Sequence, residues 1–95
     1  MEIEEMIMQL PYNLYREHEY RCHCGAVHKK NYRYELEIKI LPHFELDKPA
    51  YRFLAYYKNN EIPLGDSNKY IGHACGFGQA TLKEAIQELK GYIND

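Results

Sequence analysis

Apolar residues near the C-terminus recur at every third or fourth position, which is typical of a helix with one buried face. The residues that form this pattern are Leu82, Ala85, Ile86, Leu89 and Ile93. At the start of this pattern, Thr81 and Glu84 have the spacing of an N-terminal capping box, in which a threonine hydroxyl accepts a backbone N–H. The pattern therefore predicts a helix over about 82–93.

Alternating apolar and polar positions predict strands in the middle of the chain. The alternation runs along Tyr32–Leu41, and a further alternating segment spans Tyr51–Lys58. We expect Pro42 to end the first of these strands because proline has no backbone N–H. The segment His43–Pro49 is then expected to connect the two strands.

The remaining segments are assigned from turn formers and shorter patterns. Turn-forming residues concentrate in Asn59–Lys69, which predicts a surface loop, and Tyr70–Cys75 follows as a short strand. The β-rich segment Leu14–Cys24 is expected to form a hairpin with the strand at 32–41, with Gly25–Asn31 at the tip. One face of a short N-terminal helix is indicated by Ile3, Met6, Ile7 and Leu10.

These elements indicate one α+β domain over residues 1–95. We expect an antiparallel sheet of three to four strands packed on the C-terminal helix, with a short helix at the N-terminus. Because the C-terminal helix covers one side of the sheet, the opposite side is expected to be free. The residues on that side are Arg33, Glu35, Glu37, Arg52 and Tyr56.

Charge is small overall but unevenly placed. The formal net charge is −2, yet residues 16–33 hold five Lys or Arg against two Glu. Arginine and tyrosine are frequent anchors of interfaces, and basic residues interleaved with aromatic rings suit single-stranded nucleic acid. The residues that we predict to contact a partner are Arg21, His28, Lys29, Lys30, Arg33, Arg52 and Tyr56.

The cysteines suggest a metal site. Together, Cys22, Cys24, His73 and Cys75 have the donor set of a tetrahedral zinc site. Alternate residues of a flat strand lie about 6–7 Å apart, too far for two sulfurs that each bind one zinc at about 2.3 Å. The site therefore requires a bend at Gly25, and the alternative is buried thiols and a surface histidine.

Cysteine count and hydropathy also bear on location. An odd number of cysteines makes a poor disulfide framework, so we expect free thiols and a reducing, cytoplasmic environment. The first residues lack the pattern of a signal peptide, and no apolar run reaches the roughly 18–20 residues that span a bilayer. We therefore expect no membrane association.

The segment before the C-terminal helix offers two further chemistries. Cys75 is placed to be a thiolate nucleophile with His73 or His23 as its base. The run Gly76-Phe77-Gly78 suits a phosphate cradle, or else only shapes the turn into the helix. No pair of catalytic carboxylates stands out.

We therefore expect a non-enzymatic binding module, an inhibitor or regulator like those that phage accessory proteins provide. It would engage a protein or nucleoprotein partner through its Tyr- and Arg-rich sheet face and the basic hairpin, with nucleic acid as a candidate component. The alternative is a zinc-stabilised or thiol-dependent protein that binds a small ligand or nucleic acid through the four Cys and His residues. The partner and the oligomeric state are left open.

Overall fold

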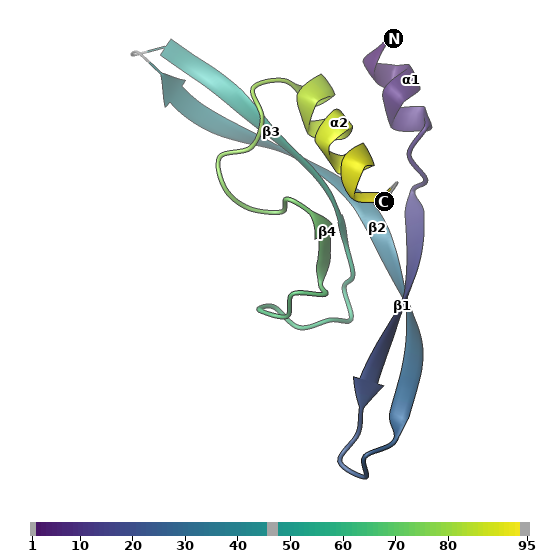
Figure 1. The fold of residues 1–95 in the computed structure, drawn as a ribbon. Coiled ribbons are helices and arrows are strands. Elements are labelled where there is room, and N and C mark those ends of the chain that lie inside the picture. The colour runs from purple at the N-terminus through teal and green to yellow at the C-terminus, as the bar shows by residue number, and fades with distance from the viewer. Residues whose placement is uncertain (1, 46–47, 94–95) are drawn as a thin grey trace.

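The computed structural model describes residues 2–45 and 48–93. For residues 44, 45, 48 and 49 it describes the backbone alone. Four strands form one curled antiparallel sheet in the order β1-β2-β3-β4 (Figure 1). The predicted α+β class, the C-terminal helix and the short N-terminal helix are confirmed. In chain order the elements are α1 (Ile3–Met8), β1 (Asn13–Arg21), β2 (Val27–Glu45), β3 (Lys48–Lys58), β4 (Tyr70–Gly72) and α2 (Leu82–Ile93).

Strand β2 is the longest element and pairs with a different strand along each half. Val27–Glu35 pairs with β1, and Glu35–Glu45 pairs with β3. At about 3.3 Å per residue, its 19 residues would span about 60 Å if straight. The molecule is correspondingly elongated, with extents of 57 × 29 × 19 Å. Each end of the sheet is therefore a two-stranded ribbon.

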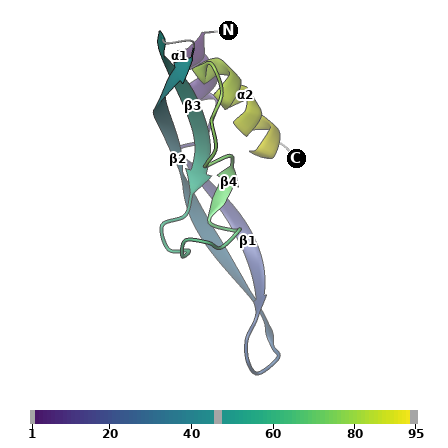
Figure 2. The same cartoon turned by 90° about the vertical axis from the view of Figure 1, so that its left-hand side faces the viewer.

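Helix α2 covers only the middle of one face of this sheet (Figure 2). Its 12 residues make a helix about 18 Å long. The predicted apolar face is confirmed, because Ala85, Ile86 and Leu89 are buried. Helix α1 packs beside α2, and the two are joined by a hydrogen bond from Lys90 Nζ to Gln9 Oε1. The core cluster comprises Met6, Leu10, Tyr34, Ala55, Tyr57, Ile62, Ala85, Ile86 and Leu89.

Two tyrosines place their rings in this core and keep their hydroxyls hydrogen-bonded. Tyr57 donates to the carbonyl of Pro11 at 2.7 Å, and Tyr34 donates to the carbonyl of Asn68 at 2.6 Å. Burial raises the pKa of both phenols. The tyrosines therefore join segments far apart in sequence, as expected for a side chain with an apolar body and a polar tip.

Two predicted boundaries are wrong. Strand β2 continues through Pro42 to Glu45, because at Pro42 it pairs with β3 on one side only and proline is tolerated at an open edge. The predicted connection His43–Pro49 is therefore strand wherever it is described, and residues 46–47 lie outside the described residues. The predicted strand Tyr70–Cys75 ends at Gly72, where β4 stops.

The segment between β4 and α2 is held against the edge of β3. Phe53 exchanges two backbone hydrogen bonds of 2.8 Å with Gln79. The backbone of Gly78 is left-handed at φ +75°, and a Cβ there would lie 2.7 Å from the carbonyl oxygen of Phe53. Thr81 Oγ1 then accepts the backbone N–H of Glu84, which confirms the predicted cap of α2.

A pair of glycine substitutions tests this close approach. Gly76 is also left-handed, at φ +100°, but open space surrounds it. Gly76→Ala should therefore lower the free energy of unfolding by about 1–2 kcal/mol, the strain of an alanine in a left-handed conformation. Gly78→Ala should cost about 1–3 kcal/mol more, because its methyl group meets backbone atoms. Urea denaturation of the two variants measures the difference, and equal destabilisation would show that the contact with Phe53 is not limiting.

Candidate functional site

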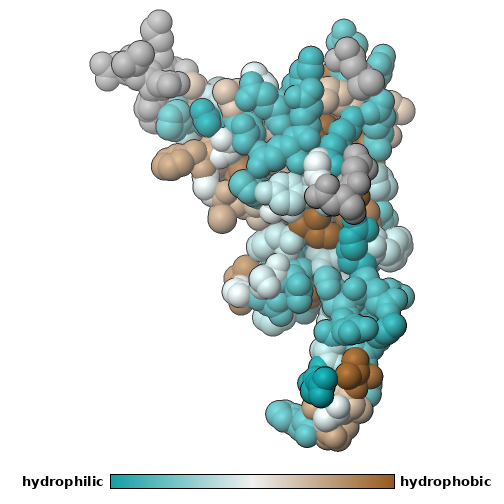
Figure 3. All heavy atoms as spheres, viewed as in Figure 1, coloured by the Kyte–Doolittle hydropathy of each residue, from teal (hydrophilic) through white to brown (hydrophobic). Residues whose placement is uncertain are grey.

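The main projecting feature of the molecule is a hairpin, residues 13–33, which we call the arm. It comprises β1, the turn at 22–26 and the start of β2, and it extends away from α2 and β4 (Figure 1). All residues from Glu19 to Asn31 are exposed except Cys22, which is half-buried. Figure 3 shows the arm as a narrow, mostly hydrophilic projection with apolar atoms near its end. The arm therefore offers both faces to a partner.

A three-residue loop closes the arm. Gly25 donates its N–H to the carbonyl of Cys22, and Cys22 donates to the carbonyl of Ala26. Gly25 is left-handed at φ +85°, which is the conformation that ends a type I turn in a hairpin of this length. The predicted bend at Gly25 is present, but the predicted tip at Gly25–Asn31 is wrong. His28, Lys29 and Lys30 lie on β2 instead of in the turn.

Strand pairing divides the residues of the arm between two faces, since directly opposite residues share a face and successive residues alternate. Tyr20 lies opposite His28, and Glu19 lies opposite Lys29. The basic face comprises Arg16, His18, Tyr20, His28, Lys30 and Tyr32. The mixed face comprises Tyr15, Glu17, Glu19, Arg21, Val27, Lys29, Asn31 and Arg33.

Charges on the mixed face are largely compensated. Lys29 Nζ lies 3.6 Å from the carboxylate of Glu17 and 3.8 Å from that of Glu19. Arg33 pairs with Glu35 at 3.4 Å. These exposed pairs add little stability, but they cancel the field that the sequence assigns to this stretch. Three of the predicted contact residues, Arg21, Lys29 and Arg33, lie on this face, where Glu17, Glu19 and the neighbouring Glu35 balance their charges.

The basic face carries aromatic rings and cations, and its strand positions include no acid. Tyr20 is 52% exposed and stacks on His28 with ring centroids 5.3 Å apart. Lys30 Nζ lies 5.2 Å from the centre of the Tyr32 ring. The acid nearest to it is Glu61 of the 59–69 loop, 3.9 Å away in an exposed pair. The predicted contact residues His28 and Lys30 lie on this face.

The base of the arm is tied to the predicted surface loop, which is confirmed at residues 59–69. The single hydroxyl proton of Tyr34 goes to the carbonyl of Asn68, so His18 Nε2, 2.8 Å from the same oxygen, must carry the proton that it donates. Asn59 is buried and donates to the carbonyl of Arg33 at 3.1 Å. A cleft of about 190 Å³ lies between this loop and the basic face.

Two predicted contact residues serve the body of the protein instead. Tyr56 is only 1% exposed, because it packs edge-on against Tyr70 and donates its hydroxyl to Glu37 at 2.7 Å. Burial and this bond raise its pKa. Arg52 donates to the carbonyls of Phe77 and Gly78. The expectation that Tyr56 contacts a partner is therefore corrected, and Arg52 is occupied in holding the 73–78 segment.

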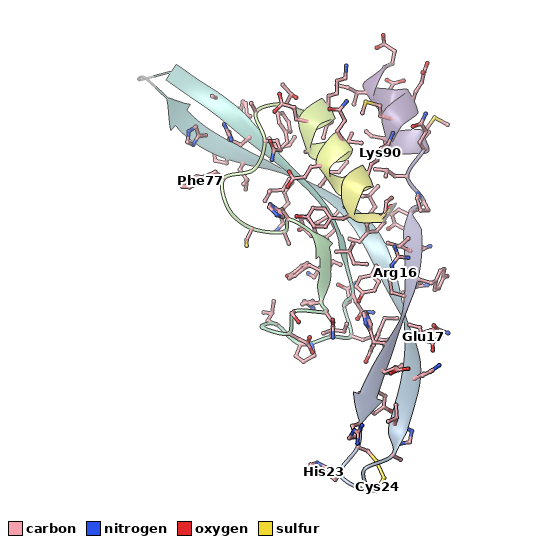
Figure 4. The ribbon with its side chains drawn as sticks, viewed as in Figure 1. Arg16, Glu17, His23, Cys24, Phe77 and Lys90 are labelled. Carbon is pink, nitrogen blue, oxygen red and sulfur yellow. A yellow bond between two sulfur atoms is a disulfide. The ribbon has the colours of Figure 1, made fainter. Side chains whose placement is uncertain are left out.

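The structure separates the four predicted zinc ligands. Cys22 and Cys24 lie in the turn at the tip of the arm, where Figure 4 labels Cys24, whereas His73 and Cys75 lie in the segment between β4 and α2, away from the arm in Figure 1. Cys22 and Cys24 form a disulfide, so the expectation of free thiols holds only for Cys75. The predicted set fails because the hairpin turn carries its two cysteines away from the body.

Another group at the tip has the chemistry of a metal site. The ligand atoms of Cys22, Cys24 and His28 all lie within 4.8 Å of one another, the one such group among residues 2–45 and 48–93. His28 reaches the cysteines because it lies diagonally across the hairpin from Cys22, on the same face. Sequence reasoning missed His28 as a ligand because only the register places it there.

The predicted nucleophile Cys75 lies near a histidine that is paired with a carboxylate. His73 Nδ1 lies 3.1 Å from the carboxylate of Glu88, beside a cavity of about 350 Å³ that Cys75 also lines. The three side chains are nevertheless not gathered within 4.8 Å of one another in the part of the chain that the structure describes. A base role of His73 toward Cys75 therefore stays a prediction.

Comparisons with models of protein families, with curated proteins and with solved structures give no match to this chain. Neither helix within the described residues is long and apolar enough to cross a bilayer. The geometry of the arm is therefore the main guide to function.

The anchoring of the arm is tested by Tyr34→Phe. Removing the hydroxyl leaves the Asn68 carbonyl and His18 without their partner and should cost about 1–3 kcal/mol of unfolding free energy at neutral pH. Because burial raises the pKa of Tyr34 above its ordinary 10.0, the wild type should lose this stability as pH rises past 10. The Tyr34→Phe variant should lose less stability over the same rise in pH.

Guanidinium unfolding as a function of pH measures both effects. Tyr15→Phe is the matched control, since Tyr15 lies on the arm but is 63% exposed. The control should change stability by less than about 0.5 kcal/mol. Equal effects of the two substitutions would contradict the anchoring role of Tyr34.

Proposed function

We propose that the protein is a non-enzymatic binding module that engages the nucleic-acid component of a nucleoprotein partner through the basic face of its arm. The observation that supports this most directly is the division of the arm into a face of rings and cations and a face of paired charges. Stacking rings next to cations are the combination that holds single-stranded nucleic acid. An inhibitor or regulator of such a partner would need no catalytic group.

The size and position of the arm support the same role. The cleft beside the basic face, about 190 Å³, is smaller than the roughly 300–1,000 Å³ of pockets that enclose small ligands. A partner of the basic face would therefore lie along the arm and would not enter this cleft. Lys30, near the middle of the basic face, would meet a phosphate, while Tyr32 beside it and Tyr20 nearer the tip present rings to bases. Arg16, at the base of the face, is half-buried and donates to the carbonyl of Ile93.

The tip of the arm favours a second candidate function. Cys22, Cys24 and His28 could hold a metal ion, and zinc is the metal that we propose for them. In that case a partner would contact both the metal and the side chains of the arm. This replaces the predicted four-ligand site with one that uses His28.

Matched substitutions on the two faces test the nucleic-acid proposal. A fluorescent single-stranded oligonucleotide should bind the wild type, with affinity that falls as salt rises. Lys30→Gln should make the slope of log affinity against log salt shallower by about 0.7, the value for one phosphate contact to a single strand. Lys29→Gln, the neighbouring lysine on the mixed face, should leave the slope unchanged.

The rings are tested in the same assay. Tyr20→Ala should cost about 1–3 kcal/mol of binding free energy, as expected for loss of one stacked base, and Tyr15→Ala on the mixed face should cost little. A wild type that binds no oligonucleotide at low salt would overturn the proposal. Equal losses from substitutions on the two faces would overturn the assignment to the basic face.

A further inference from the structure

The turn at the tip of the arm brings two cysteines of a Cys-x-Cys pair together. Gly25 bends the chain so that the Cα atoms of Cys22 and Cys24 lie 5.4 Å apart, and their sulfurs are joined in a disulfide (Figure 4). His28, on the same face, brings its imidazole within 4.8 Å of both. Both cysteines are accessible at the tip, since Cys22 is half-buried and Cys24 exposed.

We propose that the reduced tip binds one Zn²⁺ through the sulfurs of Cys22 and Cys24 and the imidazole of His28. Two thiolates and an imidazole are the donors that zinc prefers. Two sulfurs at about 2.3 Å from a tetrahedral zinc lie about 3.8 Å apart, which is inside the 4.8 Å span of the group. Opening of the sulfur–sulfur bond and small side-chain rotations are therefore enough to form the site.

The zinc keeps a fourth position for an outside donor. His23 is adjacent in sequence but does not belong to the group of gathered ligand atoms. With three protein ligands, zinc takes water or a partner's donor in its remaining position. The end of the arm is exposed, so this position faces the solvent or whatever the arm touches.

Zinc and the disulfide exclude each other, because zinc requires thiolates. A dithiol reductant breaks the Cys22–Cys24 bond by supplying two electrons and two protons and is itself oxidised to a disulfide. Zn²⁺ then displaces the two thiol protons, which are released to solvent. The state of the two cysteines therefore decides whether the tip carries metal.

This proposal deepens the second candidate function and does not depend on the basic face. Reduced, desalted protein is titrated with ZnCl₂ under nitrogen, in competition with a chromophoric chelator. One zinc per chain should bind, with release of protons. Protein with the disulfide intact should not compete. Cys22→Ser and Cys24→Ser should each abolish tight binding, and His28→Ala should weaken it by more than the roughly 10–100-fold typical of losing an outer-shell partner.

The controls are His23→Ala on the same turn and Cys75→Ser on the body, both of which should bind zinc like the wild type. Binding that is as tight in the oxidised protein or in His28→Ala would overturn the proposal. So would one zinc shared by two chains, detected as a dimer by sedimentation. Oligonucleotide binding by zinc-free protein is measured in parallel, so failure of zinc binding is distinguishable from failure of the basic face.

Discussion

The difference in length between the central strand and the helix that covers it determines the shape of this protein. Strand β2 has 19 residues and α2 has 12, and a strand rises about twice as far per residue as a helix. The helix can therefore bury only the middle of the sheet. Both ends of β2 extend beyond the core as two-stranded ribbons, and one of them is the arm.

A ribbon without a core beneath it has few interactions to hold its direction. Here the base of the arm is fixed by polar contacts to the 59–69 loop. Tyr34 joins His18 of β1 to the carbonyl of Asn68, and the buried Asn59 bonds to the backbone of Arg33. The loop is itself closed by Lys69, whose buried ammonium donates to the carbonyls of Asn59 and Ile62. Within the exposed part of the arm, the loop is paired with Lys30 through the exposed Glu61, so most of the outer half is left for a partner.

The sequence alone predicted the elements better than their ends. The apolar face of α2 and its cap at Thr81 follow from local spacing, and both are present. The extension of β2 through Pro42 could not be predicted, because it depends on which edge of the strand is left unpaired. Burial of Tyr56 likewise depends on β4, since Tyr70 packs against it only after β4 has paired with β3.

The candidate site was even harder to predict from the sequence alone. The basic stretch at 16–33 is evident from composition, but only the register of β1 on β2 separates Lys30 from Lys29 and places the latter between two glutamates. Register also brings His28 to the cysteines in place of His73. Both results follow from the three-residue turn that Gly25 closes, because a turn one residue longer would move the side chains of one strand to the opposite face.

The central claim is that the two faces of the arm differ in what they bind. It is tested most directly by NMR of the histidine and tyrosine rings and lysine side chains during titration with a single-stranded oligonucleotide. The account predicts that the resonances of His18, Tyr20, His28 and Lys30 shift together while those of Tyr15 and Lys29 stay in place. Shifts confined to the mixed face, or to the cavity beside His73 and Glu88, would contradict it.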